Sequence, residues 1–205
     1  MSNSPSPPPI DPHEWRTIPN YLSAARLILS FGVFAVIDWG GLWMTALFLF
    51  VVTAITDALD GYLARKWNQI TIWGRILDPL VDKVLICGCF IFLQSVPESS
   101  VCGWVTSTVV IREFLVTALR GHLEGQGVDF SAKWSGKLKM ILQCVVIPVI
   151  LFKLDEFGAN IAYADQVVEG LLALMVGVTA YSGAEYLWRA IQLVRQQSSS
   201  NSSDT

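Results

Sequence analysis

Residues 57–83 read DALDGYLARKWNQITIWGRILDPLVDK, a charged stretch that lies between two long apolar blocks. The stretch carries eight charges in 27 residues, whereas 15% of the whole chain is charged. Ionisable groups at membrane depth are costly, so such a cluster indicates a functional site. Of the 205 residues, 53% are hydrophobic, which argues against a disordered chain and against a soluble enzyme. The sequence therefore predicts an integral membrane protein with its polar chemistry at 57–83.

Six apolar blocks approach the length of about 20 residues that a transmembrane helix needs. They cover residues 20–37, 42–64, 76–96, 101–120, 138–153 and 167–190. We expect an all-α integral membrane fold with six transmembrane helices in one catalytic domain, residues 13–195. A short interfacial helix around Trp15 and Arg16 is expected to precede them. The Pro- and Ser-rich segment 1–12 and the Ser-rich segment 196–205 are predicted to be disordered tails.

The basic residues predict how the helices are oriented. If the six blocks alternate across the bilayer, every Lys and Arg except Lys153 falls on one side. The positive-inside rule makes that side cytoplasmic, so we expect both termini and the site at 57–83 to face the cytoplasm from the inner membrane. The net charge of −3 gives no basic surplus for binding nucleic acid. The four cysteines have the spacing of neither a disulfide framework nor a zinc site, and we interpret them as small buried side chains.

The charged stretch contains two pairs of aspartates. Each pair shares one helical face because its members are three or four positions apart: Asp57 with Asp60, and Asp78 with Asp82. Four converging carboxylates repel one another unless a cation neutralises them, and hard divalent cations prefer carboxylate oxygens. From spacing alone, two readings stay open: a divalent-metal site, or solvated charges paired with Arg65, Arg75 and Lys83.

The spacing Asp57-x2-Asp60-Gly61-x2-Ala64-Arg65-x8-Gly74-x3-Asp78-x3-Asp82 resembles, at every position, the signature of the CDP-alcohol phosphatidyltransferase family. Members of that family transfer a phosphatidyl group from a CDP-linked lipid to an alcohol and release CMP. The resemblance covers about residues 15–195. It implies six transmembrane helices, two Mg²⁺ or Mn²⁺ ions as cofactors, and a homodimer.

The resemblance also implies roles for individual residues. Asp82 is the expected catalytic base and also a metal ligand. The other expected metal ligands are Asp57, Asp60 and Asp78. The residues expected to bind the CDP-lipid are Asn20, Ser23, Gly61, Ala64, Arg65, Thr71 and Gly74.

The second half of the chain bears on the acceptor alcohol. Residues 111–122 read IREFLVTALRGH and residues 133–140 read KWSGKLKM. Both resemble the phosphatidylglycerophosphate synthase branch of the family, which joins CDP-diacylglycerol to sn-glycerol 3-phosphate. Arg and Lys side chains that converge inside a membrane protein suit a phosphate. The expected ligands of the acceptor phosphate are Arg112, Arg120 and Lys137. Snorkelling at the membrane edge accounts for Lys133 and Lys139.

Three alternatives stay open. The acceptor could be another alcohol: phosphatidylglycerol, as in a cardiolipin synthase, or inositol phosphate or serine. The chain could be a divalent-cation transporter, because intramembrane carboxylates also build ion paths. All four aspartates lie at one boundary, which argues against a path across the bilayer. A catalytically inactive member is the third alternative, and the intact set of four aspartates argues against it.

Overall fold

The structure is a computed structural model that describes residues 18–67, 72–125 and 134–201. Within these ranges it describes the side chains of 21, 23–56, 80–123 and 134–193. The described chain is helical and contains no strand. The elements are α1 (Ile18–Trp39), α2 (Trp43–Trp67), α3 (Ile72–Leu93), the 3₁₀ helix η1 (Pro97–Ser99), α4 (Gly103–Gly125), α5 (Trp134–Leu154), α6 (Glu156–Ala159) and α7 (Ala164–Asn201).

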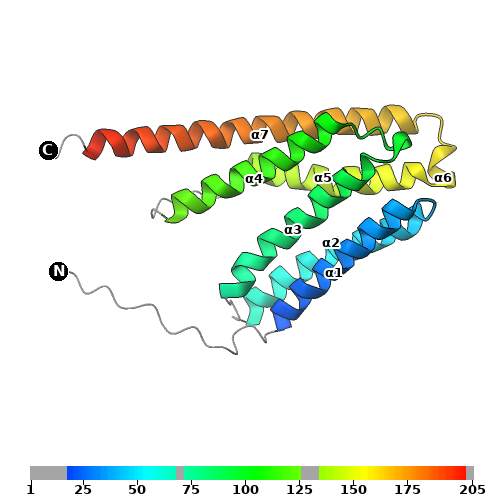
Figure 1. Cartoon of the computed structure of the whole chain (residues 1–205), viewed down its shortest axis with the longest axis horizontal. Coiled ribbons are helices and arrows are strands. Elements are labelled where there is room, and N and C mark those ends of the chain that lie inside the picture. Colours follow the sequence, from blue (N-terminus) through cyan, green and yellow to red (C-terminus); the bar gives the residue numbers. More distant parts are fainter. Residues whose placement is uncertain (1–17, 68–71, 126–133, 202–205) are drawn as a thin grey trace.

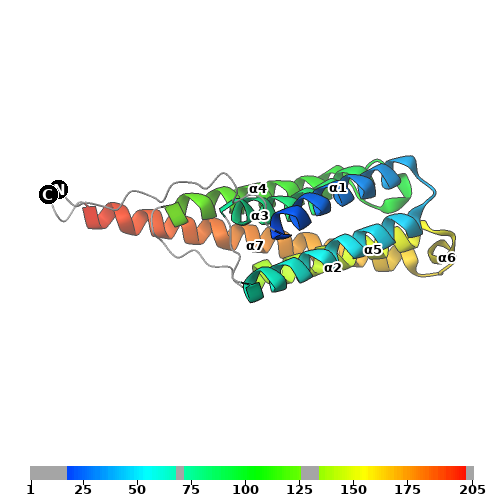
Figure 2. The ribbon, with the colours of Figure 1, turned by 90° about the horizontal axis from the view of Figure 1, so that it is seen from below.

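The long helices form two groups. In one group α1 packs against both α2 and α3, and in the other α7 packs against α4 and α5. The two groups meet chiefly where α2 contacts α5, and Figure 2 shows these two helices side by side. Figure 1 shows the groups converging at the end that carries α6 and diverging toward the other end. We call these the α6 end and the open end; α2 and α4 end, and α3 and α5 begin, at the open end.

Each predicted apolar block lies mostly within one of the six long helices, and several helices extend beyond their blocks into charged sequence. α5 begins at Trp134 rather than at residue 138, and α4 continues to Gly125 rather than ending at residue 120. Backbone hydrogen bonds do not require apolar side chains, so a charge need not end a helix. α7 continues to Asn201, past the start of the predicted tail at residue 196. The expected interfacial helix around Trp15 lies outside the described residues.

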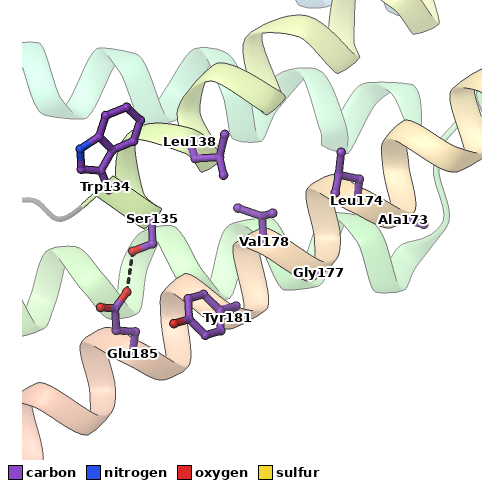
Figure 3. A pocket seen from close by; sticks show the side chains of 9 residues that line it. All are labelled: Trp134, Ser135, Leu138, Ala173, Leu174, Gly177, Val178, Tyr181 and Glu185. Atoms are coloured by element: carbon purple, nitrogen blue, oxygen red, sulfur yellow. Dashed lines mark hydrogen bonds between the residues drawn. The ribbon is translucent and has the colours of Figure 1, made fainter.

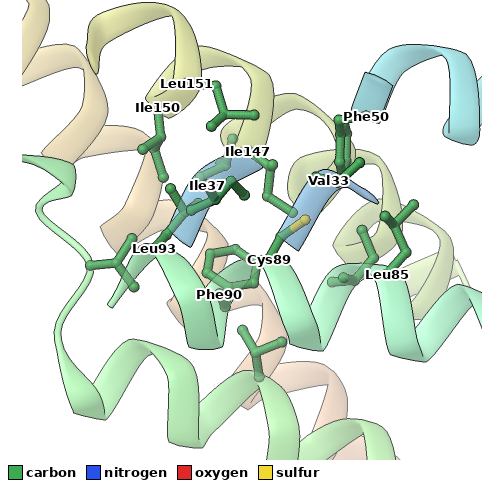
Figure 4. Close-up of a cluster of buried hydrophobic side chains, with 14 of the residues drawn as sticks. Val33, Ile37, Phe50, Leu85, Cys89, Phe90, Leu93, Ile147, Ile150 and Leu151 are labelled. Atoms are coloured by element: carbon green, nitrogen blue, oxygen red, sulfur yellow. The ribbon is translucent and has the colours of Figure 1, made fainter. Parts of the chain in front are cut away.

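The main hydrophobic core lies where α1, α2, α3 and α5 meet (Figure 4). Its fully buried members include Val33 and Ile37 from α1, Phe50 from α2, Phe90 from α3 and Ile147 from α5. Gly88 permits the close contact of α1 with α3, because a Cβ there would lie 2.1 Å from the ring of Phe34. This core joins the two helix groups and fixes the position of the polar residues on them.

One lysine ties together the α6 end. Lys153, on the last turn of α5, donates to the backbone oxygen of Glu98 at 2.6 Å and pairs with Asp165 of α7 at 2.5 Å. Its Nζ also lies 3.5 Å from Oγ of Ser100. Ser100 ends η1 with a φ of 61°, and the hydroxyl of neighbouring Ser99 donates to the oxygen of Leu93 at 2.6 Å. Lys153 thus connects the α3–α4 loop to α5 and α7.

The described helices also bear on the membrane prediction. One of them, Ala164–Leu193 within α7, is long and apolar enough to cross a membrane, and Trp43–Thr56 is a shorter apolar helix. The all-helical architecture agrees with the predicted fold class.

Candidate active site

The signature residues lie on two helices, of which α2 ends and α3 begins at the open end. Asp57, Asp60, Gly61, Ala64 and Arg65 belong to the second half of α2, and Gly74 and Asp78 belong to the first turns of α3. The side chains of these residues lie outside the described set, as does that of Asn20 on α1. Thr71 falls between the described ranges. The metal site and most of the CDP-lipid site therefore stay predictions.

Asp82, the expected base, is the one signature aspartate whose side chain is described. Its side chain is 35% exposed, and its Oδ1 lies 3.8 Å from Nη1 of Arg26, whose side chain is 1% exposed. This distance is within ion-pair range and too long for a hydrogen bond. Arg26 lies on a buried polar face of α1 together with Ser23 and Ser30, at spacings of three and four residues. The structure thus places Ser23, expected to bind the CDP-lipid, on the α1 face that also carries the Asp82 partner.

A second charged group lies between α4, α5 and α7. One carboxylate oxygen, Oε1 of Glu113, accepts from Lys139 Nζ in a very short contact and pairs with Nη1 of Arg112 at 3.3 Å. All three residues are buried: Glu113 is 5% exposed, Lys139 6% and Arg112 8%. We call them the Arg112–Glu113–Lys139 group. Buried charges need partners of opposite sign, and here two cations share one carboxylate.

Arg112 is held in place from α7 and α5 as well. Its Nη2 donates to Oγ of Ser182 at 2.6 Å, and its guanidinium carbon lies 5.7 Å from the ring centroid of Tyr186. Two glycines leave room for it. A Cβ at Gly183 would lie 3.2 Å from Cγ of Arg112, and one at Gly136 would lie 3.6 Å from Nη2. The close approach of three helices around Arg112 therefore depends on Gly136 and Gly183.

The other two expected acceptor ligands are placed less centrally. Arg120 is half-buried on α4, eight residues after Arg112, which corresponds to about 12 Å along the helix axis. Lys137 is exposed on the first turn of α5. The snorkelling interpretation of Lys139 is wrong, because this lysine is buried and bonded to Glu113. Lys137 and Lys139 differ because residues two apart on a helix point to different faces.

α3, the helix that carries the expected base, contacts both α4 and α5, the helices of the Arg112–Glu113–Lys139 group.

Sequence reasoning missed Glu113, Ser182 and Tyr186, and it gave Arg26 no role in the site. The available signal was a charged or polar residue inside an apolar helix: Arg26 and Glu113 each interrupt such a block. Ser182 and Tyr186 are one helical turn apart on α7, so they share a face. Nothing in their residue types singles out that face, because serine and tyrosine are common inside helical bundles.

A groove of about 710 Å³ runs along the outer side of the contact between α5 and α7. Figure 3 shows Trp134, Ser135 and Leu138 of α5 facing Val178, Tyr181 and other residues of α7. At the polar end of the groove, Ser135 donates a hydrogen bond to Oε2 of Glu185 at 2.7 Å. Among the residues with described side chains, no expected site residue and no member of the Arg112–Glu113–Lys139 group lines this groove.

Comparison with known proteins agrees with the resemblance seen in the motif. Residues 16–184 match the family model described as CDP-alcohol phosphatidyltransferase. A relative from Rickettsia bellii is 35% identical over 175 residues, covering 82% of this chain and 92% of its own. A relative from Bacillus subtilis is 34% identical over 196 residues, covering 85% of this chain and 97% of its own. Both are named CDP-diacylglycerol–glycerol-3-phosphate 3-phosphatidyltransferase.

These matches span the helices that carry the signature as well as those that carry the Arg112–Glu113–Lys139 group. They confirm the family predicted from the spacing of the aspartates. The chain belongs to the CDP-alcohol phosphatidyltransferase family.

Proposed function

We propose that this chain transfers the phosphatidyl group of CDP-diacylglycerol to sn-glycerol 3-phosphate, giving phosphatidylglycerol phosphate and CMP. The names of the relatives support this reaction. The observation that carries the choice of acceptor is the buried Arg112–Glu113–Lys139 group, with its surplus of positive charge. A phosphorylated alcohol suits such a group, whereas serine as an acceptor brings no phosphate. The family match also weighs against the transporter alternative.

We further propose that the six long helices all cross the inner membrane, with the open end in the cytoplasm. Helices of at least 21 residues are long enough, since about 20 residues span the hydrocarbon layer. Large apolar side chains face outward from several helices, as lipid contact requires: Ile28, Phe31, Phe48, Ile91, Ile111, Phe114 and Leu174. Exposed aromatic residues near the α6 end suit a membrane–water interface: Trp39, Trp104 and Tyr163. The expected homodimer remains a proposal.

The aspartates fit divalent metal ions by their chemistry, because all four supply hard carboxylate oxygens. Asp82 is partly exposed, and the set lies on α2, which ends at the open end, and on α3, which begins there. Asp57, Asp60 and Asp78 would hold two Mg²⁺ or Mn²⁺ ions together with Asp82. Such ions, when bound, neutralise charge on a diphosphate and on the departing CMP.

The residues of the chain then carry the steps of the reaction. Asp82 accepts the proton of the acceptor 1-hydroxyl, and that oxygen attacks the lipid-side phosphorus of the diphosphate. The bond from this phosphorus to the bridging oxygen breaks, and CMP leaves. In the motif-based expectation Arg112, Arg120 and Lys137 bind the acceptor phosphate, while Arg65 and Gly61 bind the CDP moiety. Arg26 holds the Asp82 carboxylate on the side of α1. Most of the rate acceleration comes from positioning and electrostatic stabilisation, as in phosphoryl transfer generally.

The test is CMP release by purified protein with CDP-diacylglycerol and Mg²⁺, with glycerol 3-phosphate, inositol phosphate, serine and phosphatidylglycerol offered separately. We expect CMP release with glycerol 3-phosphate and with none of the other three acceptors. Asp82→Asn should lower the rate about 100-fold or more, the contribution typical of a general base. Asp38→Asn is the matched control, because Asp38 is exposed at the α6 end and should leave the rate unchanged. Release with another acceptor would reject the proposed substrate.

A further inference from the structure

The charges of the Arg112–Glu113–Lys139 group do not cancel. Arg112 and Lys139 bring two positive charges, and Glu113 brings one negative charge. Among the residues with described side chains, Glu113 supplies the only carboxylate within ion-pair distance of either cation. All three side chains are more than nine-tenths buried. A buried excess charge is unfavourable unless an ion of opposite sign joins it, so the group calls for an anion.

The guanidinium of Arg112 has donors to spare for such an anion. Arginine carries five N–H donors, and the bonds to Glu113 and Ser182 use one on each terminal nitrogen. The buried Nε of Arg112 has no hydrogen-bond partner among the described residues. An unpartnered buried donor is rare in folded proteins and indicates a missing ligand or water.

The position of Glu113 in the sequence explains how it can direct Arg112. The two residues are neighbours on α4, and Nη1 of Arg112 donates to Oε1 of Glu113 at 3.3 Å. Glu113 bonds to Lys139 of α5 with the same oxygen, Oε1. One carboxylate oxygen therefore sets the position of a cation from α4 and a cation from α5.

We propose that Glu113 is a positioning residue: it holds Arg112 and Lys139 as one cationic pair that binds the phosphate of the acceptor, with Lys139 as the principal lysine from α5. This inference rests on the proposed function for the identity of the acceptor. It differs from the motif-based expectation, in which Lys137 supplies the lysine. Glu113 acts through the two cations and does not touch the substrate.

The first test measures KM for each substrate in Glu113→Gln and Lys139→Met, on protein shown to be folded by its thermal unfolding. We expect KM for glycerol 3-phosphate to rise about 10- to 100-fold, as for the loss of one hydrogen bond to a charged group. KM for CDP-diacylglycerol should stay within about twofold of the wild-type value. A general loss of stability would not raise one KM and leave the other unchanged. Glu185→Gln is the matched control, since Glu185 bonds to Ser135 outside the group. Lys137→Met should have a smaller effect than Lys139→Met.

A double variant separates positioning from simple charge neutralisation and serves if Glu113→Gln alone fails to fold. In Glu113→Gln/Lys139→Gln the surplus charge returns to +1, so we expect stability to recover toward wild type. If Glu113 only neutralised Lys139, KM for glycerol 3-phosphate would recover as well. The proposal expects that KM to stay raised, and a wild-type KM in the double variant would overturn it.

A binding measurement that does not use the reaction keeps the two proposals apart. Inorganic phosphate should raise the unfolding temperature of the wild-type protein and not that of Lys139→Met. Such stabilisation without any use of glycerol 3-phosphate would reject the proposed acceptor and support the anion site. Use of glycerol 3-phosphate with wild-type KM in Glu113→Gln would support the proposed function and overturn the role of Glu113.

Discussion

Replacing Gly88 by alanine tests whether the contact of α1 with α3 is as tight as the structure has it. The new Cβ would lie 2.1, 2.5 and 2.7 Å from three atoms of the Phe34 ring. Carbon atoms pack at about 3.5–4.0 Å, so the ring must retreat by about 1.5 Å. Little space is available for this, because Phe34 is 5% exposed and stacks on Phe92 with ring centroids 5.3 Å apart.

The size of the effect follows from three contributions. Overpacking of a dense core costs about 1–3 kcal/mol. Disturbing the stacked pair of rings adds about 1 kcal/mol. Alanine in a helix interior returns about 1 kcal/mol relative to glycine. The expected net loss in the free energy of unfolding is about 1–3 kcal/mol, which lowers Tm by roughly 2–10 °C in a chain of this length.

Thermal unfolding of the purified protein in detergent measures this shift. Gly32→Ala is the control, because no atom lies within 4 Å of its added Cβ, and it should leave Tm unchanged or slightly raised. Phe34→Leu placed in the Gly88→Ala background removes the clashing ring atoms and should restore part of the loss. A Gly88→Ala protein with wild-type Tm, or an equal loss in Gly32→Ala, would refute the packing described for α1 and α3.

Two further predictions concern other contacts. Gly183→Ala should raise KM for glycerol 3-phosphate severalfold, because the added Cβ lies 3.2 Å from Cγ of Arg112 and displaces it; Gly177→Ala on the same helix meets no atom within 4 Å and should keep the wild-type KM. Equal KM values in the two variants would contradict the role of Gly183 in leaving room for Arg112. Lys153→Gln should lower the free energy of unfolding by about 1 kcal/mol through the lost backbone hydrogen bond, whereas Asp165→Asn should cost less than about 0.5 kcal/mol, since Asp165 is 71% exposed. Chemical denaturation of both variants measures these free energies of unfolding. A larger loss in Asp165→Asn than in Lys153→Gln would contradict the prediction.

The sequence predicted the helical segments well because each block is a long apolar run bounded by polar sequence, and such runs are typical of helices. The ends of the helices were less predictable. α5 begins at Trp134, before the block at 138–153, because a helix does not need apolar side chains to form its backbone hydrogen bonds. A reading of apolar residues stops at Lys137, whereas the helix includes this exposed lysine in its first turn.

The site was predictable to a similar extent. The spacing of the aspartates identified the family, since these positions serve one shared chemistry. The choice between Lys137 and Lys139 was not available from the pattern. α5 is apolar on most of its surface, so its sequence does not indicate which face packs inward. The glycines at 136 and 183, which admit Arg112, show their purpose only when the helices are brought together.

The contacts of Lys153 have a consequence for membrane insertion. On the proposed topology Lys153 is the single basic residue that must be translocated, against the preference that retains Lys and Arg in the cytoplasm. Its pairing with Asp165 and with the oxygen of Glu98 becomes available only after α5, α7 and the α3–α4 loop have assembled. Until then Lys153 lacks these two partners. Assembly of the bundle would therefore help to retain the correct topology, and a chain truncated before α7 should insert less uniformly than the full chain.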